Sequence, residues 1–399
     1  MTETWTLAAL WLGLALLAGL ASIWLRVATA LSEIIVGVVA GAVIGTMAMG
    51  VDQEWVKFLA GAGAIILTFL AGAELDPEVF RRQWREATAV GLVSFAAPFL
   101  GCAAAARWLL GWDPAASWLA GVAMSTTSVA VVYAVMIEFG FNRTDYGKTV
   151  LAACFITDLG TVVALGLLFA PFTLNTLIFV GALAAVGLAV PWLTPRFFRR
   201  YGARASELEA KYLLVFLFGL GALASWADSE AVLPAYVLGM LLAGTVGRDH
   251  ALIRRLRTLC FGLLTPFYFI RAGSFVSVPA LIAAPAAFVL MLVVKVLTKI
   301  AGVYPVTRAF RAPRKEGMYT TLLMSTGLTF GTISSLFGLS HNIVDQAQYS
   351  ALVAAVIASA VIPTLIANAW FLPRHHLPAQ EVVGAENPTA SAPTRGKGK

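Results

Sequence analysis

Asp158 is a single carboxylate in an otherwise apolar run, FITDLGTVV, over residues 155–163. An aspartate at membrane depth is costly, so it is interpreted by default as a functional site. It stands about ten residues into a span predicted over 149–169, near the middle of a membrane at 1.5 Å rise per residue. There it can trade a proton for a cation, and the Thr157 hydroxyl beside it is a neutral oxygen ligand suited to hard cations. The alternative is a structural carboxylate that pairs with a lysine or caps a broken helix.

Two short segments rich in hydroxyl groups and glycine interrupt other apolar runs. One holds Thr126, Thr127 and Ser128 after Ser125; the other holds Ser325, Thr326, Gly327 and Thr329. Such residues can satisfy the backbone groups that an unwound helix frees, and unwound carbonyls can coordinate a dehydrated ion. We therefore predict that both helices unwind there; ordinary packing of small residues is the alternative. Half-helix N-termini favour an anion and C-termini a cation, so Asp158 and a lysine would suit the two kinds of end.

Three cationic residues fall inside predicted spans. Lys295 and Lys299 are four residues apart and share one helix face, although either could extend along the helix to reach the membrane surface. Arg271 keeps its charge and should face a carboxylate or a water-filled cavity, which indicates a structural or gating role. Glu74 closes the third span near the inner surface, either as a funnel carboxylate or as an ordinary polar residue at a helix end.

Other reactive residue types carry no chemistry in this pattern. The three cysteines stand in apolar runs without a C-x-x-C spacing and are interpreted as packing residues. His341 stands alone and His375-His376 lies in the tail, so neither a metal site nor a catalytic triad is predicted, and no cofactor is expected. Glycines at 37, 41 and 45 predict a helix face for close approach, more often within one chain than between two.

The composition that surrounds these residues is that of an integral membrane protein. Of 399 residues, 59% are hydrophobic and 12% are charged, against about one quarter charged in a soluble domain. Apolar runs of about twenty residues favour helices over a barrel. We predict an all-α polytopic fold of thirteen spans, with approximate ranges 5–25, 31–49, 56–74, 87–109, 117–138, 149–169, 172–191, 211–227, 231–247, 259–277, 280–307, 317–339 and 348–372.

The basic residues predict the orientation of these spans. With the N-terminus outside, only Lys57 and Arg107 of the 28 basic residues lie on the outer side, three fall within spans, and the other 23 lie inside. This is the positive-inside pattern, and it makes nucleic-acid binding unnecessary despite a net charge of +7. The first residues lack the basic start of a cleavable signal peptide. We expect a transmembrane domain over 1–373 and a disordered cytoplasmic tail over 374–399.

A short internal sequence repeat links the two segments that are rich in hydroxyl groups. Met-Ser-Thr occurs at 124–126 in the fifth span and again at 324–326 in the twelfth. Spans seven apart run in opposite directions, as the inverted repeats of secondary transporters require. A chance match of three residues is the alternative.

The chain resembles the monovalent cation:proton antiporter-2 family, which includes bacterial sodium/proton exchangers and Kef-type potassium efflux systems. The resemblance covers roughly residues 10–372 and is carried by LSEIIVGVVAG from Leu31, FLAGAEL from Phe69, TSVAVV from Thr127, Thr157-Asp158, Lys299 and Ser325-Thr326-Gly327. It implies a homodimer in which each subunit has a scaffold and a mobile core with crossed, broken helices. It also implies that Asp158 binds the proton and the cation in turn and that Lys299 compensates the charge at the helix crossing.

Two departures from the family bear on stoichiometry. Thr157 stands where many electrogenic relatives have a second acid, and Thr329 stands where many have a glutamate. A single Asp158 holds either one proton or one monovalent cation, so charge counting favours electroneutral exchange. This count fails if Lys299 also titrates.

The function predicted on these grounds is an antiporter of the bacterial inner membrane that exchanges Na⁺ or K⁺ for H⁺, with lipid as its surroundings. A sodium-coupled organic anion carrier, with Arg271 at the substrate carboxylate, is the second hypothesis. An intramembrane hydrolase is disfavoured, because Asp158 has no comparable acid partner and no histidine lies in any predicted span. The chain is therefore not expected to be an enzyme.

Overall fold

The structure is a computed structural model that describes residues 2–25, 28–73, 77–141, 144–169, 173–202, 206–227, 229, 231–283 and 285–376. All regular elements in these ranges are helices. Glu74 and the predicted disordered tail from residue 377 onward lie outside the described residues. Residues 374–376 form a short 3₁₀ helix, η4 (Arg374–His376).

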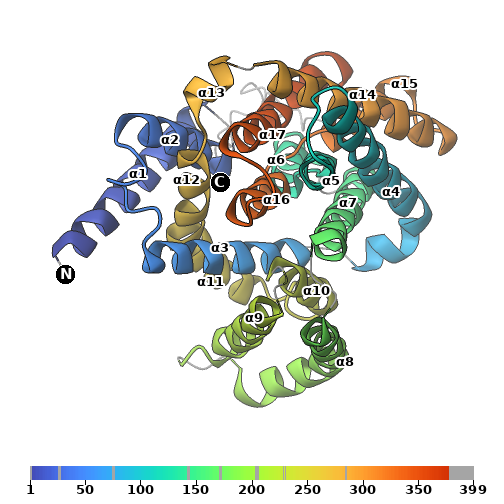
Figure 1. The fold of residues 1–399 in the computed structure, drawn as a ribbon. Helices are drawn as coiled ribbons and strands as arrows, with labels where there is room; N and C mark the ends of the chain where they lie inside the picture. Colours follow the sequence, from blue (N-terminus) through green and yellow to red (C-terminus); the bar gives the residue numbers. More distant parts are fainter. Residues whose placement is uncertain are drawn as a thin grey trace, which may run out of the picture.

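The helices pack into two groups (Figure 1). The first group comprises α1 (Thr2–Leu25), α2 (Thr29–Val43), α3 (Glu54–Ala73), α8 (Leu174–Tyr201), α9 (Leu208–Trp226), α10 (Val232–Leu242), α11 (His250–Leu259), the π-helix η2 (Cys260–Leu264) and α12 (Thr265–Ser274). The second comprises α4 (Pro77–Trp108), α5 (Pro114–Ser125), α6 (Val129–Glu138), α7 (Asp145–Phe169), α14 (Pro285–Ala309), α15 (Arg314–Met324), α16 (Thr329–Ser340) and α17 (Gln346–Ile366). α13 (Val278–Ala283) links the groups, and the π-helix η3 (Ala367–Phe371) follows α17.

These helices confirm the predicted all-α polytopic architecture. Within the described residues, nine helical segments are long and apolar enough to cross a membrane. The other four predicted spans correspond to α2, to the pair α5 and α6, to α10, and to η2 with α12. The second span ends at Val43 rather than near residue 49, because the backbone turns at Gly45, whose φ of 87° is unfavourable for residues with a side chain.

The two predicted breaks are present, and they cross. Residues 126–128 separate α5 from α6, and residues 325–328 separate α15 from α16. The amide of Ser128 donates to the carbonyl of Thr326 at 3.2 Å, so the unwound segments touch directly. The Thr127 hydroxyl donates to the carbonyl of Met324 at 2.8 Å, which satisfies a carbonyl at the C-terminal end of α15.

Close packing of α2 on α12 holds the first group together. An added Cβ at Gly37 or Gly41 would overlap the backbone of Ile270 or Ser274. The predicted close-approach face is therefore used within the chain by these two glycines. A Cβ at Gly45 would meet nothing within 4 Å, so that glycine takes no part in the contact.

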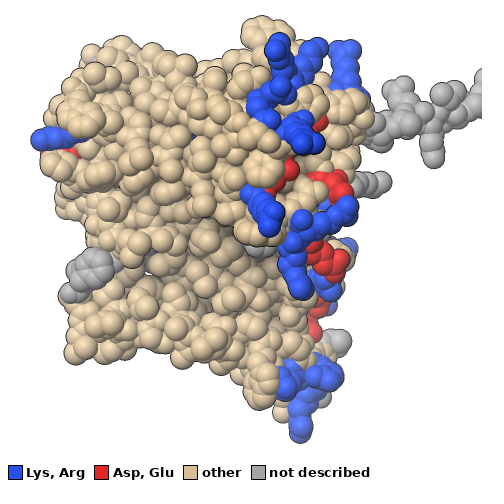
Figure 2. Space-filling view, turned by 90° about the vertical axis from the view of Figure 1, so that its right-hand side faces the viewer, with Lys and Arg blue, Asp and Glu red and all other residues tan. Residues whose placement is uncertain are grey.

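Charged side chains gather at one edge of the molecule, beside a broad belt with almost none (Figure 2). Ion pairs between exposed side chains, such as Arg82 with Asp145 and Arg255 with Glu207, join the basic residues of the predicted inner loops. Exposed apolar side chains, such as Leu177 of α8 and Leu297 of α14, also contribute to the surface of the molecule. A belt with almost no charged side chains suits contact with lipid.

Candidate ion-binding site

Asp158 is buried in the second group of helices. It lies on α7 with 1% of its surface exposed, and Oδ1 has no hydrogen-bond partner within the described part of the chain. The backbone of Thr127, in the first helix break, lies near this carboxylate. No described lysine or arginine approaches it within ion-pair distance, so the carboxylate keeps an oxygen free to bind an ion.

Lys299 fills the first break. Its Nζ donates to the Ser94 hydroxyl at 2.7 Å, to the Ser125 carbonyl at 3.1 Å and to the Thr127 hydroxyl at 3.1 Å. The Ser125 carbonyl ends α5, where the helix dipole is negative. The Lys299 ammonium therefore lies at the C-terminal end of this half-helix.

Lys295 fills the second break. Its Nζ donates to the Ser359 hydroxyl of α17 at 3.1 Å, and it faces Gly327 so closely that an added Cβ there would overlap it. Sequence reasoning preferred Lys299 and left the role of Lys295 open. The signal that could have found it was the four-residue spacing, since α14 presents both lysines on one face, one to each break.

The hydroxyls of the first break have separate partners. Thr126 donates to the Ala123 carbonyl at 3.4 Å, and Ser128 accepts from the Val131 amide at 3.3 Å and so caps α6. The Thr127 hydroxyl bridges Lys299 and the second break. All three side chains are buried, so they are held in place at the crossing.

Thr157 points its hydroxyl at the main chain. Oγ1 lies 3.1 Å from both the Gly91 carbonyl of α4 and the Ala153 carbonyl of its own helix. The hydroxyl thus joins α7 to α4 one residue before Asp158. This contact helps to fix which way the carboxylate faces.

The second break is built from Ser325, Thr326, Gly327 and Leu328. Ser325 and Thr326 donate to the carbonyls of Thr321 and Leu323 at 2.8 and 2.7 Å. Thr329 begins α16. The hydroxyls therefore satisfy carbonyls at the end of α15, which is the role that the sequence predicted for them.

Arg271 lies away from the crossing. Its Nε donates to the Val51 carbonyl at 2.8 Å, its guanidinium lies 3.6 Å from the Asp52 carboxylate, and it stacks over Phe275 at 4.9 Å. Only 12% of its side chain is exposed. These contacts fit the predicted structural role, since they tie α12 to the loop that follows α2.

Tyr236 was not singled out from the sequence. It is buried on α10, its hydroxyl donates to the Phe155 carbonyl at 2.9 Å, and it interacts electrostatically with Asp158. It is thus a contact of the first helix group with the helix that carries Asp158. A lone tyrosine in an apolar run gave no signal of this proximity.

A cavity of about 860 Å³ lies between the two helix groups. It is lined by residues of α3, α6, α7 and the α10–α11 region. Phe155, three residues before Asp158, lies along its wall, and Lys148, Arg248 and Arg254 line it toward the charged edge. The cavity thus reaches the helix that carries Asp158, and Asp158 itself is not among its lining residues.

Crossed, discontinuous helices around a buried carboxylate define a class of membrane protein, the secondary transporters built from inverted repeats. The model of the transmembrane sodium/hydrogen exchanger family matches residues 12–371, and the chain belongs to this family. The resemblance to cation:proton antiporters is thereby confirmed.

Two curated relatives are the glutathione-regulated potassium-efflux system proteins KefC of Enterobacter sp. (strain 638) and of Escherichia fergusonii. They are 27% identical over 350 residues and 26% identical over 359 residues. Each alignment covers 82% of this chain and 55% of the relative. The chain thus spans about half the length of the curated relatives it matches.

Among solved structures, the chain resembles the sodium proton antiporter MjNhaP1 of Methanocaldococcus jannaschii at pH 8. The TM-score is 0.70 at 15% identity, and the match covers 92% of this chain and 96% of the other. An electron-microscopy structure of the same antiporter gives a TM-score of 0.65. At this identity the likeness establishes the fold.

Proposed function

We propose that this protein is a secondary antiporter that exchanges Na⁺ or K⁺ for H⁺ by alternating access. The observation that carries the proposal is Asp158: a buried carboxylate with an oxygen that has no partner among the described residues, near a helix break whose Ser125 carbonyl already accepts from Lys299. A carboxylate in this position binds a proton or a cation, and the two exclude each other. The relatives, named for potassium efflux and sodium proton antiport, support the same reading.

The neutral oxygens around Asp158 would complete the shell of a dehydrated cation. Thr126, Thr127 and Ser128 form the first break, and Thr157 precedes Asp158 on α7; all four offer hydroxyl or main-chain oxygens. Hard alkali cations prefer such ligands. The selection of Na⁺ or K⁺ then depends on cavity geometry.

The lysines bear on the stoichiometry. Lys299 and Lys295 donate to hydroxyls and carbonyls and form no close pair with Asp158 in the described residues. If both keep their protons, one H⁺ moves for one cation, and exchange is electroneutral. A lysine that released a proton in each cycle would add a charge and make exchange electrogenic.

The charged edge supports an orientation in the membrane (Figure 2). Under the positive-inside rule we propose that this edge faces the cytoplasm and that the N-terminus lies outside. The large cavity, whose lining includes Arg248 and Arg254, would then open to the inside. The bacterial inner membrane is the proposed location, as for a relative of bacterial KefC proteins. A homodimer remains a prediction from the family resemblance. A funnel role for Glu74 remains one of the two predictions made from its position at the end of the third span.

Asp158→Asn tests the proposal. The amide keeps the size of the side chain but cannot hold a proton or balance a cation, so the variant should insert and fold yet lose exchange. The assay uses everted vesicles from a host without its own antiporters, with a dye that reports the pH gradient when NaCl or KCl is added. Asp52→Asn, at an exposed carboxylate, is the matched control and should retain exchange.

Full exchange by Asp158→Asn at normal protein levels would remove this residue from the mechanism. Clamping the membrane potential in the same vesicles tests electroneutrality, because an electroneutral rate does not change with potential. The organic anion carrier finds no support at Arg271, whose charge is engaged by Val51, Asp52 and Phe275. Organic anion uptake independent of pH would contradict the antiport assignment.

A further inference from the structure

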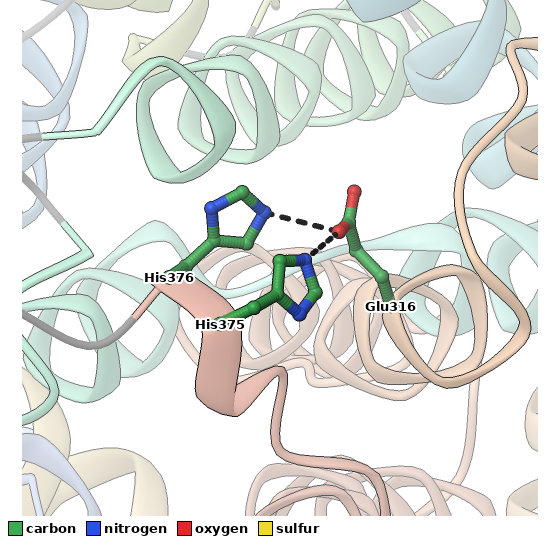
Figure 3. Close-up of side chains that lie close together, drawn as sticks. All are labelled: Glu316, His375 and His376. Atoms are coloured by element: carbon green, nitrogen blue, oxygen red, sulfur yellow. Dashed lines mark hydrogen bonds and ion pairs between the residues drawn. The ribbon is translucent and has the colours of Figure 1, made fainter.

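A second cluster of ionisable side chains lies where the segment after η3 returns to α15 (Figure 3). His375 and His376 follow one another in η4, and both direct Nε2 at the same oxygen of Glu316, in the first turn of α15. The distances to Oε2 are 2.8 Å from His375 and 3.0 Å from His376. The three ligand atoms lie within 4.8 Å of one another.

We propose that Glu316, His375 and His376 bind a divalent transition-metal ion of the Zn²⁺ class. Such an ion takes imidazole nitrogen and carboxylate oxygen ligands at about 2.0–2.2 Å, which separates tetrahedral ligand atoms by roughly 3.3 Å. The observed nitrogen–oxygen distances are already close to this separation, so an ion needs only a small opening of the cluster. Two imidazoles and one carboxylate favour Zn²⁺ or a similar metal over Mg²⁺ and Ca²⁺, which take oxygen ligands.

The surroundings hold these ligands in place. The His376 ring stacks on Tyr146 with centroids 4.8 Å apart and planes at 3°, and Phe141 meets it edge-on at 6.4 Å. The Tyr146 hydroxyl is in turn bonded to Thr320 of α15 at 2.9 Å. Supporting contacts of this kind fix the orientation of a ligating histidine and raise metal affinity.

The local charge and space also suit a cation. A cavity of about 210 Å³ beside the cluster is lined by Glu86 as well as by Glu316 and His376. A second carboxylate at its wall adds negative charge, and the cavity has room for water to complete the coordination sphere. The side chain of His375 is 55% exposed, so an ion can enter from solution.

The position of the cluster gives the ion a mechanical consequence. Glu316 lies on the half-helix that ends at the second break, whereas the two histidines follow the last membrane helix. The ion would therefore tie η4 to α15 and restrain a half-helix of the crossing. Binding itself does not depend on the proposed transport function, so the two can fail separately.

The test uses the full chain in detergent, stripped of metal and freed of any polyhistidine tag. Titration with Co²⁺ is followed by visible absorption, and titration with Zn²⁺ by calorimetry. We expect one ion per chain, its loss in His375→Ala/His376→Ala, and an affinity at least about tenfold weaker in Glu316→Gln. His250→Ala and His341→Ala, which change the other two histidines, are the matched controls and should bind as the parent does.

The melting temperature supplies a second readout. An ion that binds only the folded state raises it, by an amount that follows the ratio of free ion to dissociation constant. We expect Zn²⁺ to raise it in the parent and in both controls but not in Glu316→Gln, and Mg²⁺ to have no such effect. No binding by the parent, or unchanged binding by the double variant, would overturn the proposal.

Discussion

The two buried lysines of α14 allow a stability prediction in which the desolvation cost of a buried ammonium cancels between two variants. Lys295 and Lys299 are both fully buried, one helical turn apart. Lys299→Met and Lys295→Met therefore relieve nearly the same desolvation cost when the ammonium is removed. The difference between the variants then reports the hydrogen bonds that each lysine makes.

Lys299 has three acceptors and Lys295 has one in the described residues. Without Lys299, the hydroxyls of Ser94 and Thr127 can bond each other, since they lie 3.5 Å apart. The Ser125 carbonyl cannot rotate and loses this donor. An orphaned buried acceptor costs about 1–3 kcal/mol. This loss is the one that Lys295→Met does not share, so we expect Lys299→Met to be less stable than Lys295→Met by about 1–3 kcal/mol.

The measurement is unfolding of both variants in the same detergent, followed by the fluorescence of the eleven tryptophans. Lys57→Met, at a 43% exposed side chain, is the control. It should stay within about 0.5 kcal/mol of the parent. Equal stability of the two core variants, or a larger loss for Lys295→Met, would refute the assignment of Lys299 as the main compensating charge of the crossing.

Two further predictions concern the second break and the competition at Asp158. Gly327→Ala should destabilise the fold by about 1–3 kcal/mol, because the new Cβ would overlap Lys295 Nζ and crowd the Thr126 hydroxyl. The control is Gly219→Ala, which has nothing within 4 Å of its added Cβ and should be neutral or stabilising. Equal losses of stability in the two variants would contradict this prediction. The apparent KM for the cation should rise as pH falls in vesicles, because protons compete for the same carboxylate; a KM independent of pH would indicate separate sites.

Much of the fold could be predicted from sequence because a bilayer leaves few choices. Each span must be long, apolar and helical, so composition and run length alone fix the class and the approximate positions of thirteen spans. The breaks at 126–128 and 325–328 were also predictable, since hydroxyl side chains and glycine within an apolar span can satisfy the backbone groups that an unwound helix frees. Asp158 could be found as a candidate for the same reason.

Which residues surround Asp158 was decided by tertiary structure. Lys295 and Lys299 looked alike in sequence, and only the crossing of the two breaks gives each its own partner. Tyr236 comes to the site from 78 residues away along the chain, through the packing of α10. No local pattern encodes such a contact.

The sequence by itself identified one carboxylate and two lysines within apolar spans, where a charged side chain is costly and therefore marks a candidate functional site. Whether the lysines are buried or reach the membrane surface was left open. The tertiary structure decided what they meet, because hydrogen-bond partners depend on the register and crossing of helices far apart in the chain. The same holds for Glu316 and His375-His376. They carry no recognisable spacing in sequence, and they converge only because α15 begins where the segment after the last helix returns.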